Sequence, residues 1–314
     1  MTIEDHHGLE VVYDGPEAKL DIVAVHGLNG HREKTWTATN GVHWLRDLLP
    51  RDIPDIRVLT WSYDAATHSP DRASCQCLYS QGLELVADLT RARTLTQSIE
   101  RPIIFVAHCL GGLVVKSALI HSDAARYGVL RDRRLVITST YGVLYMGTPH
   151  RGSDGMSLGR LLANIASIFT PVDDRIPQHL ERDSEWLQQQ LNQYNPVSNK
   201  FATRFAYERY ETTVLLGYKT LVVPRAPAII PSQEDVESIA IFADHISMTK
   251  FSENTDKGYV KISEALQIMA MNAKKAIQSH WAVGARVHNE RETDGKKSEL
   301  PRSRLHPEKK DSSL

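Results

Sequence analysis

Four short apolar segments, each followed by polar residues or glycine, divide the first half of the chain. They span residues 20–25, 56–61, 102–107 and 144–147. Continuous apolar runs of this length are typical of parallel strands that are covered on both faces. Between them, residues 43–50 and 81–98 carry leucine and valine at helical spacing. Strands that alternate with helices predict an α/β protein with a mostly parallel central sheet flanked by helices.

The pattern changes after residue 147. Residues 151–200 lack a strand pattern, but Leu158, Leu162 and Ile165 recur at helical spacing. We therefore expect a helical lid insertion at 151–200, above the carboxyl edge of the sheet. Its apolar face either lines a substrate pocket or simply packs on the body of the protein.

The insertion divides the predicted core into two parts. Strand-like pieces return at 204–207 and 220–223, and a closing helix is expected near 256–279. From about residue 287 the chain is charged and lacks apolar periodicity, which is typical of disorder. The predicted segments are the first part of the core (1–150), the lid (151–200), the second part of the core (201–284) and a disordered charged tail (285–314).

Composition narrows the class of protein. The chain has 314 residues, 41% of them hydrophobic, which is enough for a full core. A formal net charge of -1 gives no long-range attraction to nucleic acid or to an anionic membrane. Three cysteines are too sparse a set for a secreted disulfide framework, and the polar start lacks a signal-peptide pattern. We expect a cytoplasmic protein without stable membrane insertion and, because no phosphate-binding loop or metal-ligand spacing occurs, without a cofactor.

The segment from Ile103 to Val115 has the pattern of a strand, a tight turn and an apolar helix. A nucleophile elbow has this form, with small residues two positions before and two positions after the nucleophile. Here Ala107 and Gly111 take the small positions, and Cys109 stands at the apex. A helix N-terminus and a nearby imidazole favour a thiolate, which is a better nucleophile than an unassisted hydroxyl. We predict that Cys109 forms an acyl-enzyme intermediate; the alternative is an inert buried cysteine.

Acyl transfer also needs two backbone N–H groups that point at the developing oxyanion. In the elbow architecture one belongs to the residue after the nucleophile, here Leu110. The other comes from the glycine-rich loop after the first strand, and we assign it to Leu28. The alternative for this loop is an ordinary turn. We expect His26 and Asn29 of the same loop to contact substrate.

The catalytic base should be a histidine late in the chain, because nucleophile, acid and base follow in that order in this architecture. His245, just before the closing helix, fits that position. His150 is the chief rival but lies too early, and His108 is expected to point away along the turn. Both are instead predicted substrate contacts. The lid residues predicted to line an acyl pocket are Leu158, Leu162 and Ile165.

The catalytic acid is expected at the end of the strand that follows the insertion. Glu208 occupies that position, and Glu211 could substitute for it. Asp173 or Asp174 would require another geometry. An ordinary solvated carboxylate at a strand end is the alternative interpretation of Glu208.

Together these motifs resemble a branch of the α/β-hydrolases that is abundant in fungi and related to serine esterases and inositol-deacylase-like lipases. The resemblance covers about residues 20–269. It implies that Cys109, Glu208 and His245 act as nucleophile, acid and base, although Cys109 stands where serine is usual and Ala107 replaces a glycine. The motifs that carry it are His26–Gly30 with Trp36, Trp61–Tyr63, His108–Lys116, Gly147–Gly152 and Asp244–Met248.

Relatives in that branch include enzymes of polyketide pathways that release or cyclise an acyl chain held on a carrier protein. The resemblance therefore implies an acyltransferase or thioesterase whose acyl substrate is delivered by an acyl carrier protein or a polyketide synthase. Cysteine suits such a role, because attack on a thioester exchanges one thioester for another. A general carboxylic-ester hydrolase and a catalytically inactive binding domain are the two alternatives.

Overall fold

A mostly parallel sheet forms the centre of the molecule. The computed structural model describes residues 7–65, 75–125, 132–150, 165, 168, 184–213, 219–223 and 238–298. In this part of the chain the sheet has seven strands. In spatial order they are β1 (Gly8–Asp14), β3 (Ile56–Ser62), β2 (Leu20–Val25), β4 (Ile103–His108), β5 (Thr140–Met146), β6 (Ala202–Glu208) and β9 (Ser238–Ile241). A short antiparallel pair, β7 (Thr212–Thr213) with β8 (Lys219–Thr220), lies outside it.

All neighbouring pairs in the sheet are parallel except the pair of β1 with β3. The carboxyl ends of β2, β4, β5, β6 and β9 therefore meet at one edge. In open α/β sheets this is the edge where ligands bind. The predicted α/β architecture with a mostly parallel sheet is confirmed.

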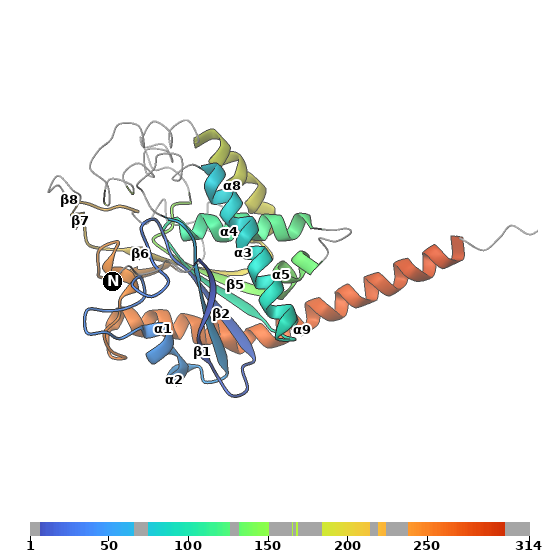
Figure 1. Cartoon of the computed structure of the whole chain (residues 1–314), viewed down its shortest axis with the longest axis horizontal. Helices are drawn as coiled ribbons and strands as arrows, with labels where there is room; N and C mark the ends of the chain where they lie inside the picture. The colour runs from blue at the N-terminus through green and yellow to red at the C-terminus, as the bar shows by residue number, and fades with distance from the viewer. Residues whose placement is uncertain are drawn as a thin grey trace, which may run out of the picture.

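Helices cover both faces of the sheet (Figure 1). One face packs on α3 (Cys75–Leu95), α4 (Gly111–Ala124), α5 (Arg134–Ser139) and α8 (Ser184–Ser198). The other face packs on α1 (Trp44–Asp47), α2 (Leu49–Asp52) and α9 (Lys257–Ser298). Alternate strand residues supply the two cores, as in β4, where Ile103 and Phe105 face one layer and Ile104 and Val106 face the other. Double coverage explains why these strands are apolar without interruption.

Two elements differ from the sequence prediction. The edge strand β1 is absent from that prediction, because its half-exposed residues form no continuous apolar run. The tail predicted to be disordered from 285 is instead helical as far as Ser298, where α9 projects beyond the body of the domain (Figure 1). This segment contains glutamate, lysine and arginine, which are good helix formers, in agreement with a helix that continues there.

The predicted lid falls largely outside the described residues, and so do Leu158 and Leu162. Ile165 and Ile168 are described, and both side chains are buried in the core beneath α4 and α8. No helix in the described ranges combines the length and the apolar character that a membrane crossing requires.

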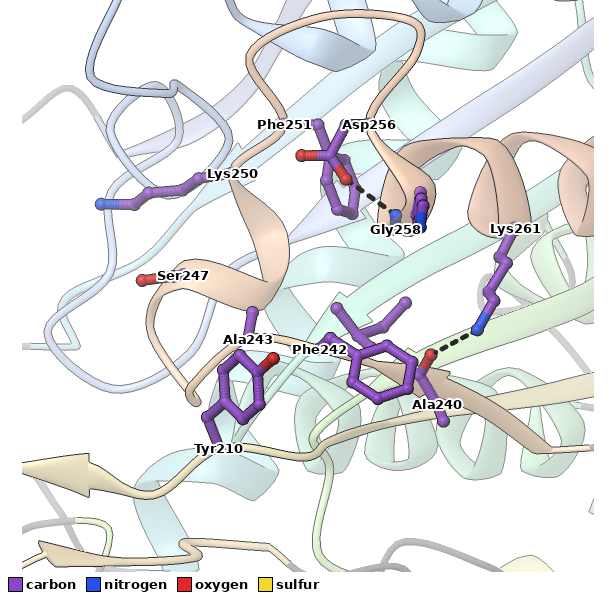
Figure 2. Close-up of a pocket in the computed structure, with 12 residues that line it drawn as sticks. Tyr210, Ala240, Phe242, Ala243, Ser247, Lys250, Phe251, Asp256, Gly258 and Lys261 are labelled. Atoms are coloured by element: carbon purple, nitrogen blue, oxygen red, sulfur yellow. Dashed lines mark hydrogen bonds between the residues drawn. The ribbon is translucent and has the colours of Figure 1, made fainter.

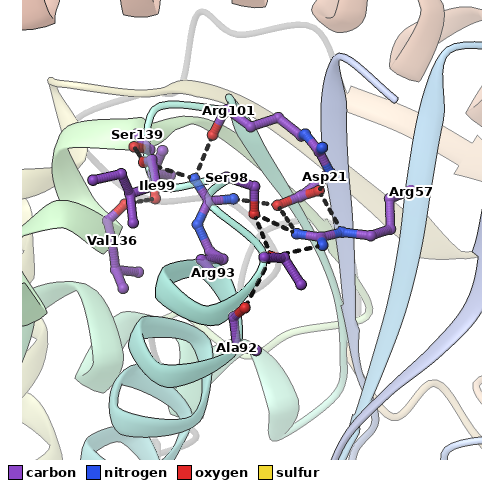
Figure 3. Close-up of polar contacts among 11 residues, drawn as sticks. Asp21, Arg57, Ala92, Arg93, Ser98, Ile99, Arg101, Val136 and Ser139 are labelled. Atoms are coloured by element: carbon purple, nitrogen blue, oxygen red, sulfur yellow. Dashed lines mark hydrogen bonds and ion pairs between the residues drawn. The ribbon is translucent and has the colours of Figure 1, made fainter. Parts of the chain in front are cut away.

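A buried ion cluster ties the amino end of the sheet together (Figure 3). The carboxylate of Asp21 on β2 accepts hydrogen bonds from Arg57 on β3, at 2.9 and 2.8 Å, and from Arg101, at 3.0 Å. Arg93 on α3 donates to the same carboxylate. Burial lowers the pKa of Arg93 to about 10, although Asp21 opposes the shift, so its guanidinium stays charged at neutral pH. The cluster therefore joins β2, β3, α3 and the start of β4.

Candidate active site

Cys109 occupies a strained turn between β4 and α4. Its backbone φ is 53°, in the left-handed region that non-glycine residues rarely adopt, and its side chain is 1% exposed. Its N–H donates to the carbonyl of Met146 at 3.0 Å, which fixes the turn against β5. Strain of this kind persists only where the surrounding structure imposes it, and it collects at functional sites.

The close packing of the turn explains its small neighbours. A Cβ atom on Gly111 would lie 2.3 Å from the carbonyl oxygen of His26, so only glycine fits there. A Cβ atom on Gly27 would lie 2.5 Å from the Cβ of Cys109, so the loop after β2 touches the nucleophile position directly. Ala107 lies in register between Val25 and Tyr145 of the neighbouring strands.

His245 and Glu208 meet at the same edge of the sheet. The Nδ1 atom of His245 lies 3.3 Å from Oε2 of Glu208, and both side chains are buried. The other carboxylate oxygen of Glu208 accepts a hydrogen bond from the N–H of Val223 at 2.5 Å. The backbone N–H of His245 donates to Oγ1 of Thr212 at 3.0 Å, which holds the base loop in place. Glu211, the alternative acid, is exposed and contributes to neither contact.

The electrostatic surroundings of His245 favour its protonated form. Burial alone would lower its pKa, but attraction to Glu208 and interaction with Cys109 outweigh burial and raise the pKa to about 10. The Nε2 atom is buried, and it has no hydrogen-bond partner within the described residues. Cys109 nevertheless acts on the imidazole strongly enough to contribute to the raised pKa. Such contacts commonly tighten only when substrate binds.

Gly147, at the carboxyl end of β5, lies against the imidazole ring of His245. Its φ is 56°, and a Cβ atom there would lie 2.9 Å from Cε1 of His245. Both the backbone conformation and the close approach require glycine. In the sequence this glycine stands out only as part of a motif, and nothing there indicates a role beside the base.

Two backbone N–H groups next to Cys109 are free to receive an oxyanion. Leu28 follows Gly27, which touches Cys109, and Leu110 follows Cys109 itself. Within the described part of the chain, neither N–H donates a hydrogen bond, whereas the next residue in the loop, Asn29, donates its N–H to Ala65 at 2.9 Å. Backbone N–H groups without a partner are one requirement of the predicted oxyanion hole.

Two predicted substrate contacts, His26 and His108, are buried and have polar partners within the protein. His26 is fully buried and stacks on Tyr63, with ring centroids 4.7 Å apart. Its Nδ1 atom lies 2.9 Å from the Gly27 carbonyl oxygen, and its Nε2 atom lies 3.3 Å from Ser62 Oγ. The Nε2 atom of His108 lies 2.9 Å from the backbone carbonyl of His245. The ring of His108 therefore turns toward the base loop, not away from it. Burial lowers the pKa of His108, which favours the neutral ring, and this form can donate from Nε2 to that carbonyl.

The remaining predicted contacts have different environments. Asn29 is exposed in the loop after β2, with φ at 51°. His150 is buried, with its ring edge-on to Tyr145 at 4.6 Å and to Phe205 at 5.2 Å. Ile165 is buried in the core cluster that also contains Cys109.

A surface pocket of about 550 Å³ lies beside the base loop, between β9 and the start of α9 (Figure 2). Tyr210 and Phe242 form one wall, and Phe251 lies opposite them. Neither Cys109 nor His245 belongs to its lining, so this pocket is distinct from the candidate catalytic centre.

Comparisons with known proteins bear on the family and the fold of the chain. Residues 22–255 match the alpha/beta hydrolase family. Protein SERAC1 of Danio rerio is 33% identical over 157 residues, covering 43% of this chain and 22% of that protein. Protein SERAC1 of Bos taurus is 26% identical over 192 residues, covering 54% of this chain and 28% of that protein. The chain thus spans about a quarter of the length of these curated relatives.

Among solved structures, the mature form of Bacillus licheniformis lipase BlEst2 is similar, with a TM-score of 0.53 and 18% identity. The match covers 83% of this chain and 97% of that lipase. At this identity the likeness shows a shared fold.

Proposed function

The chain belongs to the alpha/beta hydrolase family, and from this premise we propose that it transfers acyl groups through a covalent intermediate on Cys109. His245 would act as the proton carrier and Glu208 as its charged partner. The observation that carries the proposal is the strained turn of Cys109 beside a buried imidazole that is paired with a carboxylate.

In the first step, the Cys109 sulfur attacks the carbonyl carbon of the acyl donor. A carbon–sulfur bond forms, and the carbonyl electrons move to oxygen, which the N–H groups of Leu28 and Leu110 stabilise. The tetrahedral intermediate then expels the leaving group. The protonated His245 donates its proton to that group, so a thiol or an alcohol departs and the acyl group remains on Cys109.

In the second step, the neutral imidazole of His245 takes a proton from a hydroxyl group. The resulting oxygen nucleophile attacks the acyl-cysteine carbonyl, and the Cys109 thiolate leaves. Water as acceptor yields a free acid, an alcohol yields an ester, and a hydroxyl on the same acyl chain yields a lactone. Glu208 stabilises the imidazolium that forms again at the end of the cycle.

A thioester is the acyl donor that suits cysteine best. Transfer from a donor thioester to Cys109 exchanges one thioester for another, so the loading step is close to neutral in free energy. Loading from an oxygen ester would run uphill, because a thioester is the more reactive of the two. We therefore propose a carrier-bound or coenzyme-bound acyl thioester as substrate, with a polyketide chain as one instance.

The second candidate function is carboxylic-ester hydrolysis. The fold shared with a bacterial lipase favours it, and the same residues would serve. The two functions differ in the donor that loads Cys109 and in the preferred acceptor.

Intact-protein mass spectrometry tests the proposal. A Cys75→Ser/Cys77→Ser background leaves Cys109 as the single cysteine of the chain. Incubation with an octanoyl thioester of N-acetylcysteamine should add one acyl group, and Cys109→Ala in that background should add none. A matched p-nitrophenyl octanoate reaction compares the ester route. Rapid ester turnover without thioester loading would favour the second candidate, and loading that persists in Cys109→Ala would refute the proposed nucleophile.

A further inference from the structure

Two buried side chains, one on α4 and one beside the carboxyl end of β5, have no part in the proposed mechanism. Lys116 of α4 is 2% exposed, and His150, after β5, is 3% exposed. Both ring nitrogens of His150 are buried, and neither has a hydrogen-bond partner among the residues that the structure describes. Buried polar groups are nearly always paired, so two unpaired nitrogens on one ring call for an explanation.

These side chains belong to one group, which we term the His150 cluster and define as Lys116, Tyr145, His150 and Tyr194. The Nζ atom of Lys116 lies 5.7 Å from the ring centre of Tyr145 and 5.3 Å from that of Tyr194. The two tyrosine hydroxyls are 2.7 Å apart and bond to each other. His150 contacts the ring of Tyr145. Amine, imidazole and hydroxyl groups thus converge in an otherwise apolar core.

A short segment of chain connects the cluster to the candidate catalytic residues. Gly147 touches the imidazole of His245, and a Cβ atom on Gly112 would lie 2.2 Å from Oγ1 of Thr148. His150 follows two residues later and enters the cluster. The Oγ1 atom of Thr148 is also buried without a partner within the described ranges. Buried polar atoms without a partner in the described residues therefore occur both beside α4, at Thr148, and in the cluster, at His150.

The chemistry of the cluster suits an uncharged oxygen. Burial lowers the pKa of Lys116 well below its ordinary value. Burial is the larger cause that lowers the pKa of His150, and its proximity to Lys116 adds to the shift. Burial thus disfavours the charged form of both groups. In its neutral form an amine or an imidazole can donate and accept a hydrogen bond, as a hydroxyl group can.

We infer that the His150 cluster is a subsite that binds a hydroxyl or keto oxygen carried on the acyl chain of the substrate. The inference rests on the proposed acyl transfer and adds a substrate class to it: oxygenated acyl chains over plain ones. A bound hydroxyl would satisfy one nitrogen of His150, whereas a plain alkyl chain would leave both nitrogens buried and unpaired. Sites built to bind a hydroxyl discriminate strongly against analogues that lack it.

Matched thioesters of N-acetylcysteamine test the subsite in the full-length protein. The set contains octanoyl, its 3-, 5- and 7-hydroxy derivatives, the 5-keto derivative, and suberyl, which ends in a carboxylate. We expect kcat/KM for at least one hydroxy or keto substrate to exceed that for octanoyl by about tenfold or more. His150→Phe and Lys116→Met should each bring that ratio close to one.

His121→Phe is the matched control, because His121 lies on the same helix but contacts Tyr79 instead of the cluster. Its substrate ratio should equal that of the unmodified protein. Thermal unfolding of each variant separates loss of fold from loss of preference. Equal turnover of plain and oxygenated chains, or a preference that survives both cluster variants, would show that internal water alone satisfies these atoms and would overturn the inference. A preference for suberyl would overturn it in favour of an anion site, and failure to turn over any substrate would overturn the proposed function as well.

Discussion

Replacing Asp21 by asparagine should destabilise the protein more than any surface substitution. The Asp21 carboxylate is fully buried and accepts hydrogen bonds from Arg57, Arg93 and Arg101 (Figure 3). An asparagine side chain would offer one oxygen in place of two, and its amide N–H groups would face guanidinium donors. The arginines would then remain buried without a counter-charge.

The expected loss follows from that uncompensated charge. Removing one partner of a buried ion pair typically costs about 3–5 kcal/mol. A typical domain has a free energy of unfolding of about 5–15 kcal/mol, so Asp21→Asn would remove a large part of it. Urea denaturation followed by tryptophan fluorescence measures the change, and the transition should move to clearly lower urea concentration.

Asp55→Asn is the matched control. Asp55 also pairs with a cation, Lys19, at 2.6 Å, but both side chains are about half exposed, at 52% and 49%. Water and salt screen such a pair, so its loss should barely move the transition. A second substitution, Arg93→Met in the Asp21→Asn protein, should restore part of the stability by removing an unpaired buried charge. If Asp21→Asn and Asp55→Asn unfold at the same urea concentration, the reasoning from burial is wrong.

Three further predictions concern the candidate catalytic residues. Gly27→Ala places a Cβ atom 2.5 Å from that of Cys109, so we expect a stability loss of about 1–3 kcal/mol and loss of acyl loading, measured by denaturation and mass spectrometry. Glu208→Gln removes the attraction that raises the pKa of His245. Because the first step needs protonated His245, the alkaline decline of thioester turnover should begin at lower pH in this variant. An unchanged pH–rate profile would contradict the pairing of Glu208 with His245. Cys109→Ser removes one cause of the raised pKa of His245, but attraction to Glu208 still favours the protonated form of this base. The variant should therefore load acyl groups slowly at neutral pH and faster as pH rises, because its base must first lose a proton; a flat profile from about pH 6 to 10 would count against this.

The core of the fold could be predicted because the inner strands are apolar on both faces. Strands such as β2 and β4 have a pattern that few other structures share, and their order with helices then predicts a parallel sheet. The edge strand β1 has no such pattern, since it pairs with β3 alone and its residues are partly exposed. The length of α9 escapes prediction because residues 285–298 lack the apolar periodicity that marks a packed helix.

The candidate site was predictable where steric requirements leave a trace in the sequence. Gly111 follows from the elbow, and the order of nucleophile, acid and base pointed to Glu208 and His245. Contacts between distant segments left no such trace. The approach of Gly147 to His245, or of His108 to the base loop, depends on how three strands align at one edge. The Asp21 cluster likewise joins residues up to 80 positions apart, so no local sequence pattern predicts it.

The electrostatics of His245 fit cysteine better than the serine that is usual at the elbow. A serine hydroxyl needs a neutral imidazole to take its proton at the moment of attack. Here Glu208 and Cys109 together hold the imidazole in its protonated form through neutral pH, with a pKa of about 10. A protonated imidazole cannot activate a hydroxyl, but it is the form that accompanies a thiolate and that can protonate a leaving group. A raised pKa of His245 therefore agrees with the thiolate partner that the proposed acyl transfer requires.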